Sequence, residues 1–390
     1  MEKKNDSLFS KNIILVLAAS FFYMASPMLV TPLITGFAGT IGANGTVMGI
    51  VGGAMNFCSL ICRPLMGNLT DKMTKYRLSF IGACFLFVSS LGYVFVGNVP
   101  LLLILRILNG VGFSCCSVCL STWVSQLLPK NKIGAGMGLY GTMNALSMAI
   151  APAVGVALRN AYNIRISFIA AVIFACLCMI TVQFVSDKGE PAHAQNEKNG
   201  KLQILDINVL PITFTTMFFA IPYCATQSFI VNYVESRALN VTVGLFFPAY
   251  AVFLLILRFS LKSLFDKLPF MTFMTIGNAG ALCSMLLLWK MDNDLMLIAA
   301  AFFMAVGYGT MCTVCQSNAI LIAGEGKRGL ANSTYLIGLD LGMTLGPVLG
   351  GIVFGHVPHE SFYPVFMADV PLCFVVYMIS KVMIGKKKAQ

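Results

Sequence analysis

The chain has 390 residues, of which 58% are hydrophobic and 11% are charged, and its mean hydropathy is +0.83. Soluble domains carry roughly 25% charged residues, so this composition excludes an ordinary soluble enzyme or binding domain and indicates a chain that crosses a membrane several times. A net charge of +11 is also found on nucleic-acid-binding surfaces. Here the basic residues lie mainly in the loops on one side of the membrane, so the charge is explained by membrane topology. We therefore expect a lipid bilayer, and no nucleic acid, as a partner.

Twelve apolar stretches are long enough to span a bilayer, which takes about 20 mostly apolar residues. The first six lie near residues 12–36, 45–66, 78–97, 99–127, 134–158 and 164–186. The second six lie near residues 207–231, 242–262, 270–290, 295–320, 330–354 and 364–385. The first stretch exceeds the ~7–15 residues of a signal-peptide core, so it is interpreted as a spanning helix. The sequence predicts an all-α membrane protein with twelve transmembrane helices.

The polar segment at residues 187–206 is the one connection long enough to separate two domains. It predicts an N-terminal six-helix bundle at 1–186, a linker at 187–206 and a C-terminal six-helix bundle at 207–390. Of the 26 Lys and Arg residues, 21 fall on the side of the N-terminus, four fall on the opposite side, and Arg106 falls within a span. Basic residues gather on the cytoplasmic side of membrane proteins. We expect both termini and the linker in the cytoplasm, and the chain in a bacterial inner or plasma membrane.

Three stretches of sequence recur between the two halves. RPLMGNLTDK at 63–72 corresponds to RFSLKSLFDK at 258–267, and APAVG at 151–155 corresponds to GPVLG at 346–350, both at an offset of 195 residues. CSVCLS at 116–121 corresponds to CTVCQS at 312–317 at an offset of 196 residues. Repeated halves are typical of secondary transporters, whose substrate site lies where the repeats meet.

Four motifs resemble signatures of the major facilitator superfamily. GNLTDKMTKYR at 67–77 resembles the motif of the loop between spans 2 and 3, and LRILNGVG at 105–112 resembles the motif of span 4. SMAIAPAVG at 147–155 and GMTLGPVLGG at 342–351 resemble the Gly-Pro signature of its efflux branch. The resemblance extends over essentially the whole chain and is greatest to bacterial twelve-span drug/proton antiporter-like exporters. It implies two pseudo-symmetric six-helix bundles and transport by alternating access.

The resemblance also assigns roles to the loop motif and to the Gly-Pro motifs. The loop motif implies a conformational latch, and the alternative is an anchored loop with the usual cytoplasmic charge; its residues are Arg63, Gly67, Asp71, Lys72 and Arg77. The Gly-Pro motifs imply close helix packing through Pro152, Gly155, Gly342, Gly346, Pro347 and Gly350. Thr74 and Ala151 replace glycines of the family pattern, and span 1 lacks the acidic residue that some drug antiporters carry.

Arg106 is permanently charged and lies about seven residues inside span 4. Charged residues within spans usually face a cavity or a partner, so we expect Arg106 to line a cavity or to take part in proton coupling. The alternative is a hydrogen-bond anchor to neighbouring carbonyls. Polar faces on the central spans complete a largely apolar cavity suited to amphipathic or moderately hydrophobic solutes. Its candidate lining residues are Tyr23, Arg106, Asn109, Asn144, Tyr223, Gln227, Tyr308 and Gln316, and the same faces contain Tyr140 and Cys312.

Asp340 stands in the glycine-rich stretch TYLIGLDLGMTLGPVLGG at 334–351. It lies about 15 Å along the helix from the start of its span, close to the middle of a ~30 Å hydrocarbon core. Glycines recur every four residues in this stretch and predict a close-packed face, from which Asp340 points away. A carboxylate at this depth has the surroundings of a proton carrier, and the alternative is an Asp held by hydrogen bonds within the helix packing. Its counterpart in the first half is Ala145, and the proton-coupling candidates are Asp340, Arg106 and Asp369.

The 13 Cys residues lie almost wholly within apolar runs, where we expect them to act as small packing residues. The pairs Cys116/Cys119 and Cys312/Cys315 have no His or carboxylate nearby in sequence, so we expect no metal and no cofactor. The sequence contains no phosphate-binding loop of the Walker type, and we expect no enzymatic activity.

These observations together predict a secondary active transporter that carries out proton-coupled efflux of amphipathic or drug-like compounds or metabolites. The alternative is an uptake carrier or uniporter for a metabolite, nutrient or chelate, because a fold does not determine function. A more remote alternative is a non-transporting membrane sensor, which would need a sizeable domain outside the membrane. The expected partners are a small-molecule substrate and protons, and the chain is expected to be a monomer.

Overall fold

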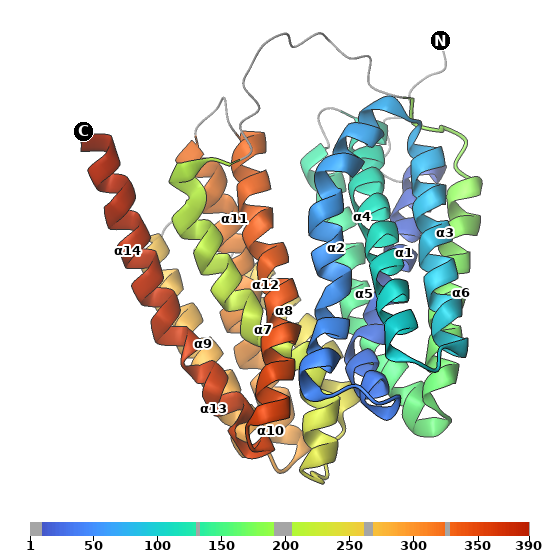
Figure 1. Ribbon diagram of the computed structural model, residues 1–390. Coiled ribbons are helices and arrows are strands. Elements are labelled where there is room, and N and C mark those ends of the chain that lie inside the picture. The colour runs from blue at the N-terminus through green and yellow to red at the C-terminus, as the bar shows by residue number, and fades with distance from the viewer. Residues whose placement is uncertain (1–9, 130–132, 191–204, 261–267, 324–327, 390) are drawn as a thin grey trace. The chain divides into compact units, whose positions relative to one another are not determined.

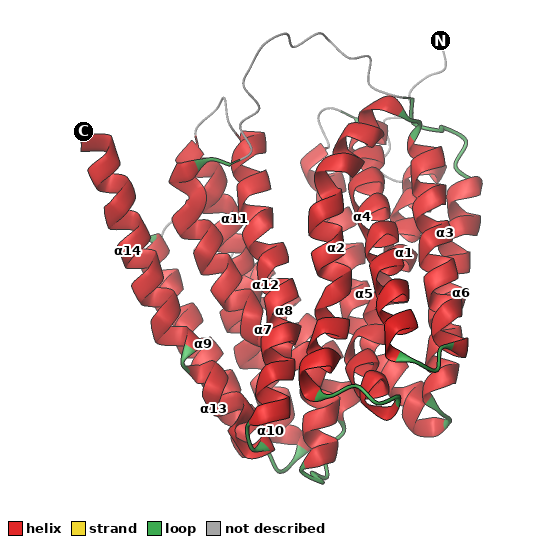
Figure 2. Cartoon of the chain, in the orientation of Figure 1, coloured by secondary structure: helices red, strands yellow, loops and turns green. Residues whose placement is uncertain are grey.

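The computed structural model describes residues 10–129, 133–190, 205–260, 268–323 and 328–389. Within these ranges all regular secondary structure is helical (Figure 2), which confirms the predicted all-α fold. The helices of the first half, labelled in Figure 1, are α1 (Lys11–Thr40), α2 (Gly45–Lys72), α3 (Lys75–Phe95), α4 (Val99–Leu127), α5 (Ile133–Ala161) and α6 (Ile164–Gln183).

The second half has the same helical character but more interruptions. Its helices are α7 (Leu210–Ser236), α8 (Phe246–Ser260), α9 (Phe270–Lys290), α10 (Asp294–Met304), α11 (Thr310–Ala323), α12 (Arg328–His356), α13 (Phe362–Met367) and α14 (Asp369–Ala389). Short helical turns are η2 (Ile207–Val209), η3 (Val243–Leu245) and η5 (His359–Ser361), and η4 (Ala305–Gly309) is a π-helix.

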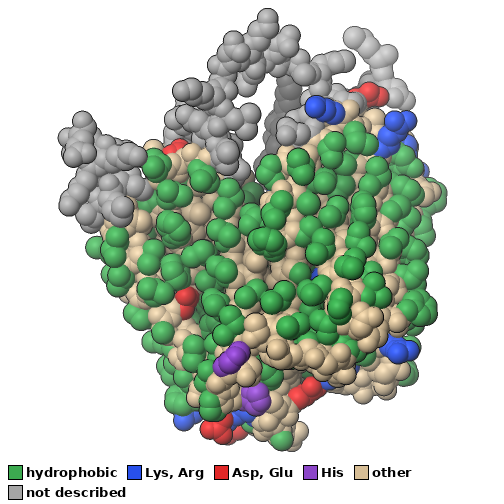
Figure 3. Space-filling model, in the orientation of Figure 1, with side chains coloured by type: hydrophobic (Ala, Val, Ile, Leu, Met, Phe, Trp, Pro, Cys, Tyr) green, Lys and Arg blue, Asp and Glu red, His purple; other side chains and the backbone are tan. Residues whose placement is uncertain are grey.

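Among the described residues, eleven helices are long and apolar enough to cross a membrane. A shorter apolar helix at Val243–Arg258 lies where the eighth span was predicted, and that prediction at 242–262 runs into residues outside the described ranges. On the face drawn in Figure 3, hydrophobic side chains cover the middle of the helices, and most basic and His side chains lie towards the helix ends. With the shorter helix counted, the described part agrees with the predicted twelve spans.

The first of two compact units comprises Met1–Gly42 and Phe57–Glu197. Within it α1 packs against α4, α5 and α6, and α3 packs against α4 and α6. The central place of α1 follows from its sequence. Nearly every face of this helix has apolar or small side chains, and helices of this kind are buried on all sides. Ser10 caps its start by accepting a hydrogen bond from the Ile13 N–H at 3.4 Å.

The second unit comprises Ala43–Asn56 and Lys198–Gln390. Within it α7 has the central place and packs against α11, α12 and α14. The first half of α2 belongs here, because Gly45, Gly49 and Gly53 lie directly against the α12 backbone and Asn56 Nδ2 donates to the Met343 carbonyl at 3.2 Å. This grouping differs from the sequence-based division, which placed residues 43–56 in the N-terminal bundle.

The central helices of the two units have the same local structure at an offset of 195 residues. Pro27 lies within α1 and Pro222 within α7. One turn after each proline, Thr31 Oγ1 donates to the Pro27 carbonyl at 2.9 Å and Thr226 Oγ1 donates to the Pro222 carbonyl at 2.8 Å. A proline removes one helical N–H donor, so both central helices lack one backbone hydrogen bond at the same register.

The predicted tenth span, 295–320, is not one uniform helix. It consists of α10, the π-helix η4 and α11. A π-turn closes through i→i+5 bonds and therefore takes up one residue more than an α-turn. This accounts for the offset of 196 residues at the Cys-containing stretch directly after η4. The segment between that stretch and the Gly-Pro motif is one residue shorter in the second half, so the offset there returns to 195.

Both described ends of the predicted linker at 187–206 are attached to the helices. Lys75, fully buried at the start of α3, donates from its N–H to the Gly189 carbonyl at 2.9 Å and from Nζ to the Glu190 carbonyl at 3.1 Å. Trp123 Nε1 donates to the Asp187 carbonyl at 3.1 Å. At the other end, the Asp206 N–H donates to Thr334 Oγ1 at 2.9 Å.

Candidate functional site

The first unit holds a polar cluster contributed by α1, α4 and α5. The hydroxyl oxygens of Tyr23 and Tyr140 lie 3.3 Å apart, and the Tyr140 hydroxyl also donates to the Ser117 carbonyl at 3.4 Å. The Phe113 ring lies 5.9 Å from the Tyr23 ring, measured between centroids. One turn after Tyr140, the Oδ1 atom of Asn144 is buried without a hydrogen-bond partner among the described residues. The predicted cavity residues Tyr23 and Asn144 therefore both flank Tyr140.

Arg106 and Asn109 are packed inside the first unit, against α3. Their side chains are 1% and 0% exposed. Arg106 interacts with Tyr93, and Asn109 Nδ2 donates to Ser89 Oγ at 2.8 Å. Both residues therefore have side-chain partners on α3, and the cavity-lining role of Arg106 and Asn109 stays a prediction.

The second unit contains a cluster of tyrosines that we call the tyrosine cluster: Tyr223 of α7, Tyr250 of α8, Tyr308 of η4 and Tyr335 of α12. The rings of Tyr223 and Tyr308 stack with their centroids 4.0 Å apart, and the Tyr250 centroid lies 5.1 Å from that of Tyr223. Gln227 Nε2 donates to the Tyr223 hydroxyl at 2.6 Å. The π-helix η4 carries Tyr308 into this stack, and single π-turns of this kind occur frequently at functional sites.

Sequence reasoning did not select Tyr250, Tyr335 or Arg258 as site residues. The Tyr335 hydroxyl donates to the Cys312 carbonyl at 3.0 Å, and the charge of Arg258 is within interaction range of both tyrosines. The internal repeat could have identified two of them, because Tyr335 lies 195 residues after Tyr140 and Arg258 lies 195 residues after Arg63.

Asp340 is buried within the second unit, with 3% of its surface exposed. Its backbone carbonyl accepts a hydrogen bond from Thr344 Oγ1 at 2.8 Å. The glycines of α12 lie against α7: a Cβ atom at Gly342 would come within 2.5 Å of the Ala220 Cβ, and one at Gly346 within 2.6 Å of the Ile221 carbonyl. The glycine face of this helix therefore packs on α7.

The same kind of contact occurs at the matching Gly-Pro motif of the first unit. Gly155 of α5 lies against Leu29 of α1, and Pro152 is within α5. In the second unit, Gly350 lies against Phe229 of α7, while the carbonyl of Pro347 lies against Gly49. In each unit the glycine after the proline therefore brings this helix close to the central helix, α1 or α7.

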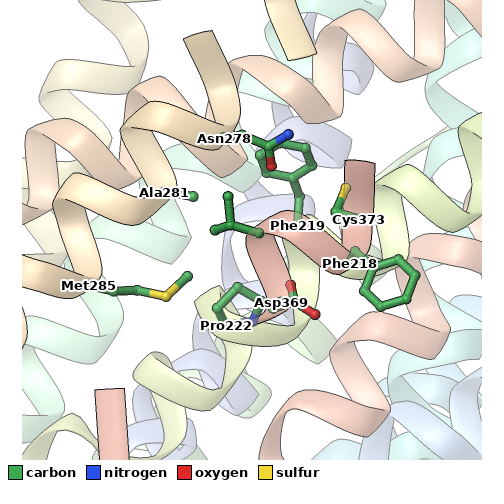
Figure 4. A pocket seen from close by; sticks show the side chains of 9 residues that line it. Phe218, Phe219, Pro222, Asn278, Ala281, Met285, Asp369 and Cys373 are labelled. Carbon is green, nitrogen blue, oxygen red and sulfur yellow. The ribbon is translucent and has the colours of Figure 1, made fainter. Parts of the chain in front are cut away.

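Asp369 lines a small pocket of the second unit that α7, α9 and α14 enclose. In Figure 4, Asp369 lies beside Pro222 on one side of the pocket, and Asn278 lies on the opposite side. Asn278 is buried, and its Nδ2 atom has no hydrogen-bond partner in the part of the chain that the structure describes. The interior has room for about one water molecule. The remaining lining is mostly apolar: Phe218, Phe219, Ala281, Met285, Val370 and Cys373.

The predicted twelfth span, 364–385, is broken next to this pocket. It is divided between α13 and α14 at Ala368, directly before Asp369. Pro371 follows within the first turn of α14 and supplies no N–H donor. The break places the carboxylate at a helix start rather than on a continuous helix face.

The remaining predicted site residues lie on α11 and on or near α2 and α3. Gln316 is exposed, and its Nε2 donates to Asn332 Oδ1 at 3.0 Å. In the predicted latch, Lys72 and Arg77 are exposed, Arg63 and Gly67 are partly buried, and the Asp71 side chain lies outside the described part. The buried cation of this loop is Lys75, whose Nζ also donates to the Thr70 carbonyl at 2.8 Å.

Buried cysteines of α4 donate hydrogen bonds to carbonyls of α3. Cys115 Sγ donates to the Leu78 carbonyl at 3.0 Å, and Cys119 Sγ donates to the Lys75 carbonyl at 3.0 Å. All 13 cysteines have free thiols. Among the described residues, no three His, Cys, Asp or Glu side chains form a group that could hold a metal ion.

A repeated set of apolar helices, with polar clusters and acidic residues inside them, defines a polytopic membrane carrier. Residues 15–293 and 270–389 match the sequence profile of the Major Facilitator Superfamily. The chain belongs to this superfamily, which confirms the family predicted from its motifs.

Two curated relatives match most of the chain. An uncharacterised MFS-type transporter of Methanocaldococcus jannaschii is 23% identical over 360 residues, covering 88% of this chain and 91% of the relative. The multi-drug resistance efflux pump PmrA of Streptococcus pneumoniae is 23% identical over 378 residues, covering 88% of this chain and 90% of the pump. Among solved structures, a POT family transporter in complex with 5-aminolevulinic acid has a TM-score of 0.78 at 13% identity, covering 98% of each chain. This likeness shows a shared fold.

Proposed function

We propose that this chain exports small amphipathic molecules in exchange for protons. The observation that supports this most is the tyrosine cluster, in which stacked aromatic rings are combined with a few polar groups such as Gln227. Ligand sites of this makeup suit amphipathic solutes. The similarity to an efflux pump over most of both chains supports the outward direction of transport.

Two carboxylates of the second unit are the proposed proton carriers. Asp340 is buried in α12, and Asp369 lines the pocket beside Asn278. Ionisable residues inside membrane helices are expensive to keep and commonly mark ion or proton pathways. Arg106 is proposed to hold α3 and α4 together rather than to titrate, because its charge is permanent and it contacts Tyr93.

We further propose that the chain is divided into two helical bundles, at 1–186 and 207–390, joined by a cytoplasmic segment. Both termini are proposed to lie in the cytoplasm. The chain is proposed to act as a monomer in the cell membrane. The loop with Gly67, Asp71 and Lys72 is proposed as a conformational latch, supported by its resemblance to the superfamily motif. Labelling of single cysteines introduced at residues 4 and 388 from either side of the membrane tests the placement of the termini.

The decisive test uses purified protein in liposomes with an imposed pH gradient. A panel of fluorescent solutes, cationic ethidium, zwitterionic norfloxacin and anionic 1-naphthoate, is followed together with a trapped pH-sensitive dye. Export coupled to protons predicts solute movement against its gradient and opposite in direction to proton movement. Solute and proton movement in the same direction would instead assign uptake by symport. If the transport rate of every transported solute is the same with and without the pH gradient, proton coupling is excluded.

A further inference from the structure

Arg258 lies on the inward face of α8. Tyr250, Leu254 and Arg258 follow one another at intervals of four residues and share this face. Tyr250 and Leu254 are buried, and Arg258 is partly buried, whereas Val252 and Ile256 on the opposite face are more than half exposed. The guanidinium is therefore directed towards the interior of the second unit rather than towards lipid.

Among the described residues, the surroundings of Arg258 provide hydroxyl groups and no carboxylate within ion-pair distance. Its charge is within interaction range of Tyr250 and Tyr335 and of the Cys312 thiol. Its Nε atom is buried without a hydrogen-bond partner, and it forms no ion pair with a carboxylate within the described ranges. A guanidinium stays charged at every physiological pH, and a buried charge without a partner is destabilising. An anion at this position would remove that penalty.

We propose that Arg258, together with the hydroxyls of Tyr250 and Tyr335, binds the carboxylate or phosphate group of an amphipathic solute. A guanidinium can bind either group through two parallel hydrogen bonds. The Tyr250 hydroxyl can donate its proton to the same group, and the Tyr335 hydroxyl can do so by rotating its proton away from the Cys312 carbonyl. The neighbouring Tyr223–Tyr308 stack offers aromatic surface to an apolar body. This inference rests on the proposed function, because it names the class of molecule that the transporter carries.

The first unit contains a related arrangement. Arg63 corresponds to Arg258, and its charge is within interaction range of Tyr23 and Tyr140. The Tyr140 hydroxyl donates to a carbonyl of α4, as the Tyr335 hydroxyl donates to a carbonyl of α11. The combination of arginine and tyrosine is therefore a repeated element, of which the proposal concerns the copy in the second unit.

Binding of three probes of one shape to the purified full-length protein tests the proposal. The probes are 1-naphthoate, 1-naphthyl phosphate and the uncharged 1-naphthamide, and binding is measured by equilibrium dialysis in detergent. We expect the better of the two anions to bind about tenfold more tightly than the amide. Arg258→Gln should abolish this preference while amide binding is retained, and Arg258→Lys should keep part of it. Arg165→Gln, which removes an exposed arginine of α6, is the matched control.

The outcomes separate the inference from the proposed function. If the wild type binds neither anion better than the amide, or if Arg258→Gln keeps the anion preference, the anion site is wrong whether or not the protein transports solutes. If the anion preference depends on Arg258 but no probe crosses the membrane, the site stands and the transport proposal fails. A preference for the carboxylate over the phosphate, or the reverse, identifies which anionic group the site accepts. Retained amide binding by Arg258→Gln shows that the variant is folded.

Discussion

The Tyr223 and Tyr308 rings stack with their centroids 4.0 Å apart and their planes inclined by 14°. The two residues belong to different helices, and Tyr308 lies in the π-helix η4. The stack therefore depends on an irregular turn in a chain that is otherwise regular on both sides of it. A stacked aromatic pair of this kind contributes about 0.5–1.5 kcal/mol beyond the area that it buries.

Replacing Tyr308 should weaken the handling of aromatic solutes. We expect Tyr308→Ala to raise the KM of the best-transported panel solute by roughly 2- to 10-fold, because one aromatic face of the site is removed. Tyr308→Phe keeps the ring and should stay close to the wild type. Tyr162→Ala removes a tyrosine that is 73% exposed and serves as the control. An unchanged KM for Tyr308→Ala would remove the tyrosine cluster from the solute site.

Neutral replacement of the two acidic residues should uncouple transport from the pH gradient. We expect Asp340→Asn or Asp369→Asn to lose pH-driven export while solute exchange at equal pH continues, because Asn cannot release a proton. The measurement is solute efflux from liposomes with and without the pH gradient. Loss in only one variant assigns the proton carrier to that residue. If both variants respond to the gradient as the wild type does, neither carboxylate is the coupling group.

Removing the buried lysine of the loop between α2 and α3 should destabilise the first unit. Lys75 Nζ donates to the Thr70 carbonyl and to the Glu190 carbonyl. Lys75→Met leaves both acceptors without this donor, and Thr70 is buried. We expect the free energy of unfolding to fall by about 1–3 kcal/mol, measured by denaturant unfolding in detergent. Lys72→Met alters an exposed lysine of the same loop and should have little effect. Equal stability of the two variants would show that Lys75 is not a structural anchor.

A single methyl group should disturb the packing of α12 on α7. The Cβ of Gly346→Ala would lie 2.6 Å from the Ile221 carbonyl, so one of the helices has to move. We expect a loss of about 1–3 kcal/mol in stability from this overpacking, read as a lower melting temperature in detergent. Gly141→Ala, at a helical glycine with nothing within 4 Å of its added Cβ, should be neutral or slightly stabilising. A melting temperature unchanged by Gly346→Ala would contradict the close-packed interface.

The helices and the superfamily were predictable because both can be recognised from short stretches of sequence. Spans follow from the length of apolar runs, and the family follows from motifs such as GNLTDKMTKYR. The Gly-Pro motifs also identified which helix faces are small enough for close packing. These signals need no knowledge of which helices are neighbours.

The site residues were less predictable because their roles depend on neighbouring helices. Arg106 and Asn109 share a polar face in sequence, and only the position of α3 shows that Tyr93 and Ser89 occupy that face. Tyr335 is one tyrosine among apolar residues until α11 places the Cys312 carbonyl beside its hydroxyl. The break before Asp369 likewise needs the fold, because Pro371 alone does not show where the preceding helix ends.

The hydrogen bonds of the Tyr140 and Tyr335 hydroxyls also show how far the two halves of the chain agree. The bonds from Tyr140 to Ser117 and from Tyr335 to Cys312 each join residues 23 positions apart, which is what a duplicated half-chain is expected to retain. Asp340 corresponds in sequence to Ala145, and η4 corresponds to regular helix in α4, so the two halves differ at these positions. The repeated bonds give the two halves a common framework, and the unmatched residues give the second half chemistry that the first half lacks.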